Sequence, residues 1–206
     1  MKSDKKIITI SRGYGTYGHE VGRILAEKLG YAFYDRQLIT IAARESGYTE
    51  DIVENSENVS TNPLGFVMNK RIALRQYGMN MNDRLYNIQY GIIRTIADRE
   101  NAVIIGRCAD HILKDYAKTM NFFIDADMDY RVAVAMDLQG LDEKEAIQFV
   151  QKMDKYRSTY YNYYTEMEWG ARENYDLCIN RTGISDEDAA DLIYSYLKLR
   201  GWFVED

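Results

Sequence analysis

Three glycines near the N-terminus have the spacing of a phosphate-binding turn. Gly13, Gly15 and Gly18 lie between an apolar run that ends at Ile10 and a helical pattern that follows Glu20. At such a strand-to-helix junction, exposed backbone N–H groups and the positive end of the helix dipole favour a bound phosphate. The alternative is a tight turn in which the glycines serve only the backbone geometry. Their density at one junction favours the anion site.

Two different phosphate-binding patterns fit these glycines. The spacing Gly-x-Gly-x-x-Gly, with Asp35 roughly 20 residues further on, is the dinucleotide fingerprint and predicts a hydride-transfer enzyme. The spacing Gly-x-x-x-x-Gly is that of a Walker A loop, whose lysine and hydroxyl residue are here replaced by His19 and Glu20. The glycines alone leave both a nucleoside triphosphate and a dinucleotide open as ligands.

Four arginines at the ends of predicted elements add the charge that a phosphotransferase needs. A transferred phosphoryl group is stabilised by positioned cations, because the protein does little covalent chemistry on it. Arg12, Arg107 and Arg131 follow three predicted strands, and Arg157 lies in a later helical segment. The carboxyl ends of parallel strands share one edge of a sheet, where ligands bind. The arginines therefore favour phosphoryl transfer at that edge.

The elements that would position these residues alternate between strands and helices. Short apolar runs separated by helical patterns predict an α/β fold, with a parallel sheet and helices on both faces. Gly30 is placed to end the first helix, and the pairs Asp142 with Glu145 and Ser185 with Asp188 resemble the N-terminal caps of two later helices. The five predicted strands span residues 7–10, 31–34, 103–105, 121–124 and 176–179.

The length and charge of the chain limit the function classes. A chain of 206 residues suits one α/β domain with an insertion. An excess of 32 acidic over 26 basic residues argues against a protein that coats nucleic acid or an anionic membrane. A helical insertion is expected at residues 37–99, where four apolar residues share one helical face: Leu85, Ile88, Ile92 and Ile96.

Neither membrane insertion nor secretion is expected from the sequence. No apolar run approaches the length of a membrane span, and the N-terminus has no apolar signal region. The protein is therefore expected in the cytoplasm. Its cysteines, Cys108 and Cys178, lie in or beside apolar runs without metal-ligand spacing, which predicts two buried and reduced thiols.

Four sequence blocks, in order along the chain, resemble successive blocks of the cytidylate kinase-like P-loop proteins. They span residues 8–20, 33–39, 103–113 and 175–180. The resemblance implies a three-layer P-loop NTPase fold with a five-stranded parallel sheet, a helical acceptor insertion at about 37–99 and a short lid at about 140–170. It also implies a single domain over residues 1–206, with core segments 1–36 and 100–206.

The reaction implied by this resemblance is transfer of the γ-phosphoryl group of ATP to CMP or dCMP, with Mg²⁺. The loop that would hold the ATP phosphates comprises Ser11, Arg12, Gly13, Tyr14, Gly15, Thr16, Tyr17, Gly18 and His19. The residues that would act on the transferred group are Arg12, Arg107, Arg131, Asp154 and Arg157. Those that would face the acceptor nucleotide are Asp35, Arg107 and Asp110.

The loop departs from the family pattern in one respect. Cytidylate kinases carry a lysine in the loop, and here that position falls on Gly18 or His19, neither of which carries a permanent charge. Arg12 is the residue expected to supply the missing charge. The departure leaves a second hypothesis, a nucleotide-binding regulatory protein without transfer activity. A run of tyrosines is expected to pack a helix or a homodimer surface rather than to stack a base: Tyr160, Tyr161, Tyr163 and Tyr164.

Overall fold

The structure, a computed structural model, describes residues 4–35 and 81–203. Five strands form one sheet in which every pairing is parallel, in the order β2-β3-β1-β4-β5. The five strands predicted from the sequence are all present, which confirms the α/β fold with a five-stranded parallel sheet. They are β1 (Ile7–Arg12), β2 (Ala32–Tyr34), β3 (Ala102–Ile105), β4 (Thr119–Asp125) and β5 (Leu177–Asn180).

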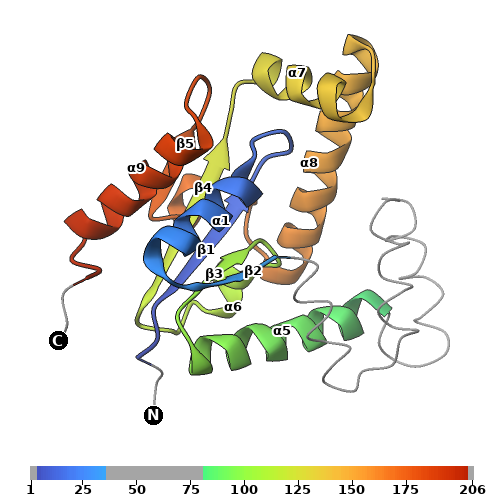
Figure 1. The fold of residues 1–206 in the computed structure, drawn as a ribbon. Helices are drawn as coiled ribbons and strands as arrows, with labels where there is room; N and C mark the ends of the chain where they lie inside the picture. The colour runs from blue at the N-terminus through green and yellow to red at the C-terminus, as the bar shows by residue number, and fades with distance from the viewer. Residues whose placement is uncertain (1–3, 36–80, 204–206) are drawn as a thin grey trace.

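Helices cover both faces of the sheet and complete the three layers (Figure 1). The side chains of Ile8 and Ile10 pack into the core under α1 (Gly18–Leu29) and α9 (Asp186–Leu199). Ile7 packs into the core under α5 (Met81–Arg99) and α6 (Ala109–Ile112). No helix in the described ranges is long and apolar enough to cross a membrane. The helices are α1 (Gly18–Leu29), α5 (Met81–Arg99), α6 (Ala109–Ile112), α7 (Met128–Gln139), α8 (Glu143–Thr165) and α9 (Asp186–Leu199), with a 3₁₀ turn, η1 (Arg172–Asn174).

The helix ends carry the caps that the sequence predicts. Gly30 adopts a left-handed conformation, with φ of 65°, and ends α1. Asp142 and Glu145 form a reciprocal capping box at the start of α8. The hydroxyl of Ser185 accepts a hydrogen bond from the N–H of Asp188 at the start of α9. A left-handed glycine and local polar side chains therefore set these boundaries, independently of tertiary contacts.

The predicted insertion is described only in its second part, because residues 36–80 lie outside the described residues. Residues 81–99 form the long helix α5. After the sheet's fourth strand, α7 and α8 pack on each other and stand at the carboxyl edge of the sheet (Figure 1). Of the two, only α8 lies within residues 140–170, the predicted lid. The predicted apolar face of α5 is buried: Leu85, Ile88, Ile92 and Ile96.

One of the two predictions about the cysteines is wrong. Cys108 is buried as expected, but Cys178 is exposed. Its strand, β5, is at the edge of the sheet, and within this strand only Ile179 is buried. The apolar run around Cys178 predicts a strand buried on both faces, whereas β5 lies at the edge of the sheet and is only partly covered.

Candidate functional site

Residues 13–17 form a tight loop between β1 and α1. The buried hydroxyl of Thr16 closes the loop from within by donating a hydrogen bond to the carbonyl of Gly13 at 3.0 Å. Gly15 has a φ of 78°, and a side chain there would lie 2.9 Å from the backbone oxygen of Arg131. No hydrogen bond within the described part of the chain uses the N–H groups of the last three loop residues. These donors, at the N-terminal end of α1, are available to an anion.

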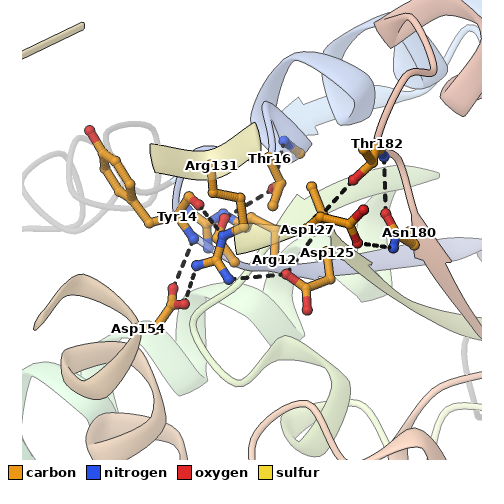
Figure 2. A network of polar contacts seen from close by, with 12 residues as sticks. Arg12, Tyr14, Thr16, Asp125, Asp127, Arg131, Asp154, Asn180 and Thr182 are labelled. Carbon is orange, nitrogen blue, oxygen red and sulfur yellow. Dashed lines mark hydrogen bonds and ion pairs between the residues drawn. The ribbon is translucent and has the colours of Figure 1, made fainter. Parts of the chain in front are cut away.

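Arg131 of α7 and Asp154 of α8 brace the loop from the β4 side (Figure 2). Arg131 donates a hydrogen bond to the carbonyl oxygen of Tyr14 at 2.7 Å and pairs with the carboxylates of Asp154 and Asp125. Asp154 in turn accepts a hydrogen bond from the N–H of Tyr14 at 2.8 Å. The Arg131 side chain is only 7% exposed. Both polar groups of the Tyr14 backbone are therefore fixed by a buried ion pair.

A pocket of about 130 Å³ opens towards β3, at the carboxyl ends of β1 and β3. Among the described residues that line it, none is acidic. Positive charge beside aromatic walls suits an anionic ligand with an apolar part. The lining combines three arginines with three large rings: Arg12, Arg107, Arg157, Tyr160, Tyr161 and Trp169.

Hydrogen bonds and ring contacts orient the three arginines. Arg157 donates a hydrogen bond to the carbonyl oxygen of Arg12 at 2.9 Å. The guanidinium of Arg107 lies 5.9 Å from the centroid of the Tyr160 ring, a cation–π distance. The Arg12 side chain reaches β3, because a side chain on Gly106 would come within 2.5 Å of its Nη1. Burial lowers the pKa of Arg157, yet a guanidinium stays charged in proteins.

A left-handed turn after β3 places Arg107. Gly106, Arg107 and Cys108 have φ values of 67°, 59° and 56°. For a residue with a side chain, this conformation costs about 1–2 kcal/mol, and such strain is often retained at functional sites. Burial raises the pKa of the Cys108 thiol, which therefore stays protonated and is a poor nucleophile. The turn thus supplies the position of Arg107 rather than a reactive thiol.

Asp110 lies behind the pocket lining. It is 5% exposed, and one of its carboxylate oxygens accepts a hydrogen bond from the hydroxyl of Tyr161 at 2.6 Å. Its other oxygen has no hydrogen-bond partner among the described residues. Burial raises the pKa of Asp110, because the charged form is poorly solvated there. Tyr161, which lines the pocket, is the link between Asp110 and the site.

His19 and Asp35 contact each other beside the loop. Nε2 of His19 lies 2.9 Å from Oδ2 of Asp35, and the imidazole packs edge-on against the ring of Phe33. Asp35 follows β2, the strand next to β3 in the sheet. The structure thus brings a loop residue predicted for ATP together with a residue predicted for the acceptor.

The sequence matches a known protein family over most of its length. A model of the cytidylate kinase-like family matches residues 7–183. The chain belongs to this family. No curated protein sequence matches the chain.

Solved structures share the fold of this cytidylate kinase-like protein. An uncharacterized protein from Eubacterium ventriosum ATCC 27560 is 29% identical, with a TM-score of 0.72 over 94% of this chain and 99% of that chain. Shikimate kinase from Bacteroides thetaiotaomicron is 14% identical, with a TM-score of 0.53 over 94% and 98%. Shikimate kinase from Acinetobacter baumannii in complex with shikimate is 16% identical, with a TM-score of 0.54 over 96% of each chain. The likeness to the two kinases shows a common P-loop kinase fold.

The strand order of this cytidylate kinase-like chain differs from that of the dinucleotide fold. In the dinucleotide fold, the first strand pairs with the second, in the order 3-2-1-4-5-6. Here β3 lies between β1 and β2. The glycine spacing also has a packing reason, because a side chain on Gly13 would lie 2.9 Å from Oδ1 of Asp125, and one on Gly18 would lie 2.7 Å from Cβ of Arg12. These findings remove the basis for the hydride-transfer hypothesis.

The cytidylate kinase-like pocket gathers some of the residues proposed from the sequence and leaves others apart. Arg131 and Asp154 do not line the pocket and instead hold the loop backbone at Tyr14. Asp110 is one layer behind the lining. The residues that the pocket brings together are Ser11, Arg12, Arg107 and Arg157.

Several pocket residues were not assigned to a site from the sequence. No sequence pattern assigns Trp169 to a site, and the sequence predicts that the tyrosines of α8 pack a helix or a dimer surface. A periodic signal was nevertheless present, because the pocket residues of α8 recur at i, i+4, i+7 and i+8, which is one helical face. These residues are Met153, Arg157, Tyr160 and Tyr161.

The described residues fit Mg²⁺ only as a partner of bound phosphates. They contain no group of three or more side chains that could hold a metal. In phosphoryl-transfer sites, Mg²⁺ is bound by one or two carboxylates together with water and substrate phosphates. Asp125 at the end of β4 is such a carboxylate, since its side chain is 52% exposed and lies against Gly13 of the loop. An ion that arrives with a nucleotide would find Asp125 as a protein ligand.

Proposed function

We propose that the protein transfers the γ-phosphoryl group of ATP to a small acceptor, which is CMP, dCMP or a related anionic compound. The observation that supports this proposal is the pocket in which Arg12, Arg107 and Arg157 converge beside the phosphate loop. The transition state of phosphoryl transfer spreads negative charge over the oxygens of the transferred group. Preorganised cations in a site with little water stabilise that charge.

Each part of the site has a distinct role in this proposal. The N–H groups of loop residues 15–17 bind the nucleotide phosphates at the start of α1. Arg12 and Arg157, joined through the Arg12 carbonyl, lie where the loop meets the pocket and stabilise the transferred group. Arg107, held over Tyr160, binds the acceptor. Asp125 would hold Mg²⁺, which would supply positive charge to the bound phosphates. The expected compartment is the cytoplasm, which supplies ATP.

The described pocket suits the anionic end of an acceptor. Its volume of about 130 Å³ is smaller than the ~300–1,000 Å³ of most small-molecule sites. A phosphate or carboxylate group fits such a space, with three arginines to bind it. The family points to a cytidine nucleotide as the acceptor, and the fold neighbours include kinases of shikimate, a small carboxylate. Both classes carry the anionic group that this pocket would hold.

An acceptor panel tests the proposal. ADP release would be measured with ATP and Mg²⁺, alone and with CMP, dCMP, the other nucleoside monophosphates or shikimate. One acceptor should raise ADP release well above the control without acceptor. Arg107→Met should abolish most of that rise, whereas Arg172→Met, at an exposed arginine of η1, should preserve it.

A second candidate function is nucleotide-dependent regulation without transfer. His19 and Glu20 favour it, because they replace the lysine and the hydroxyl residue that hold phosphate and metal in a Walker loop. Calorimetry with ATP distinguishes the two functions. Tight binding of ATP, with no acceptor raising ADP release, would support regulation and contradict transfer.

A further inference from the structure

The imidazole of His19 is held in a defined orientation beside the phosphate loop. Nε2 of His19 lies 2.9 Å from Oδ2 of Asp35, and the ring centroids of His19 and Phe33 are 5.2 Å apart at an interplanar angle of 86°. The side chain of Asp35 is 16% exposed and that of His19 is 49% exposed. One side of the imidazole thus contacts a mostly buried carboxylate, and the other side is open to a ligand.

Charged groups surround His19 from β1, from β2 and from its own helix. Asp35, after β2, is the anion in direct contact with the ring. On α1, Glu20 is the next residue, and its carboxylate is paired with Arg23. At the end of β1, Arg12 packs against the residue that precedes His19. The helix dipole at the start of α1 disfavours a cation, whereas Asp35 favours one.

We propose that His19 and Asp35 form a proton-dependent cation site, in which the imidazole takes up a proton from solvent when the phosphates of ATP bind in the loop. The inference rests on the proposed function, because it requires ATP in this loop. A neutral imidazole brings no charge to phosphate, whereas an imidazolium brings the single charge that a lysine would have carried. Phosphates and the Asp35 carboxylate act on the ring in the same direction, and together they outweigh the helix dipole.

Proton uptake makes ATP affinity depend on pH in a defined direction. Where the bound protein holds one more proton than the free protein, affinity falls as the pH rises, by up to about tenfold per pH unit. Below the pKa of the imidazole in the free protein, the ring is charged in both the free and the ATP-bound protein, so ATP affinity does not change with pH. Above the pKa in the complex, the ring is neutral in both states and affinity is again level.

The two histidines of the chain allow a direct measurement. Their imidazole signals in an NMR titration are assigned with one variant, His19→Gln. His111 of α6 serves as the internal control, since it is partly buried and burial lowers its pKa. With saturating ATP and Mg²⁺, the pKa of His19 should rise by about one unit or more, a tenfold shift in protonation, while that of His111 should stay unchanged. An unchanged His19 titration at saturating ATP would overturn the inference.

Two variants test the consequence for affinity, with calorimetry from pH 6 to pH 9. His19→Lys carries a permanent charge, and His19→Gln can still hydrogen-bond Asp35 but cannot become charged. The ATP affinity of wild type should resemble that of the lysine variant at pH 6 and that of the glutamine variant at pH 9. The wild-type affinity should therefore change by about tenfold between the two pH values. Any protonation of ATP itself is common to all three proteins. Parallel pH profiles would overturn the inference alone, whereas failure of every protein to bind ATP would overturn the proposed function as well.

Discussion

The two sides of the phosphate loop use arginine in different ways. On the β4 side, Arg131 is surrounded by the carboxylates of Asp125 and Asp154 and braces the loop backbone. On the β3 side, Arg107 and Arg157 line a pocket whose described walls carry no acidic residue, although Asp154, outside that lining, favours the charged form of Arg157. A buried arginine with carboxylate partners has its charge balanced within the fold, whereas one without them favours an anionic ligand. The positions of the carboxylates therefore distinguish Arg131, which is enclosed by two of them, from Arg107, whose pocket has none in its described lining.

Replacing Arg131 should have the largest effect on stability. Arg131→Met fills the same volume but leaves two carboxylates without their cation, and breaking a buried pair in this way costs about 3–5 kcal/mol. The expected loss is near the lower limit, because Asp125 is 52% exposed and can be solvated. Urea unfolding measures the loss. Arg172→Met, at an exposed arginine, should change the free energy of unfolding by less than about 0.5 kcal/mol.

Replacing Arg157 should affect activity more than stability. Arg157→Met removes a cation that is disfavoured by burial and favoured by Asp154, so the free energy of unfolding should fall less than in Arg131→Met. It also removes a charged donor from the pocket, and a hydrogen bond to a charged group is worth about 1.5–3 kcal/mol. Acceptor-dependent ADP release should therefore fall about 10- to 100-fold. If Arg157→Met unfolds as readily as Arg131→Met, the two sides of the loop do not differ in role.

The separate roles of Asp154 and Arg157 could not be predicted from the sequence. Asp154 and Arg157 are three residues apart on α8 and were expected to act together on the transferred group. In the structure, Asp154 contacts the Tyr14 backbone, whereas Arg157 donates to the carbonyl of Arg12. Both contacts join residues about 140 positions apart, and they depend on how α8 docks against the loop. No local sequence pattern predicts how α8 docks against the loop.

Local features, in contrast, were predictable. The strands follow from short runs of buried isoleucine, valine and phenylalanine, and the helix ends follow from Gly30 and the polar caps. The exposed thiol of Cys178 marks the limit of this reasoning, because a short apolar run does not distinguish an edge strand from a central one. Local sequence patterns therefore predict the fold class, but they do not predict the roles of the charged residues.

The turn at Gly106 allows a finer test on the pocket side. Gly106 has a φ of 67°, and a Cβ there would lie 2.5 Å from Nη1 of Arg12. Gly183 has a φ of 74° and nothing within 4 Å of the same position. Replacing either by alanine should cost about 1–2 kcal/mol of stability through backbone strain. Only Gly106→Ala should also displace Arg12 and weaken ATP several-fold in calorimetry. Equal ATP affinities for the two variants would show that Arg12 does not depend on this turn.

The smallest expected effect concerns Asp110, the buried carboxyl on the pocket side. Burial raises its pKa above the value of about 3.9 for an unfolded chain. Below that value, the carboxyl is protonated in both states. As the pH rises through the folded pKa, the group must ionise where water is excluded, and the free energy of unfolding falls. Asp110→Asn still accepts the hydrogen bond of Tyr161 and never ionises, so its stability relative to wild type should increase from pH 4 to pH 7.

Urea unfolding over that pH range measures the trend, and Tyr161→Phe provides the contrast. The hydrogen bond from Tyr161 lowers the pKa of Asp110, so its removal should make the loss of stability with pH steeper than in wild type. A constant gap between Asp110→Asn and wild type would mean that Asp110 is ionised throughout. It would then be a carboxylate close behind the arginine-lined wall, and the contrast with the carboxylate-rich β4 side of the loop would be weaker. A gap that widens with pH would instead mean that burial keeps this acid neutral, so that the charge of the pocket arginines remains available to an anion.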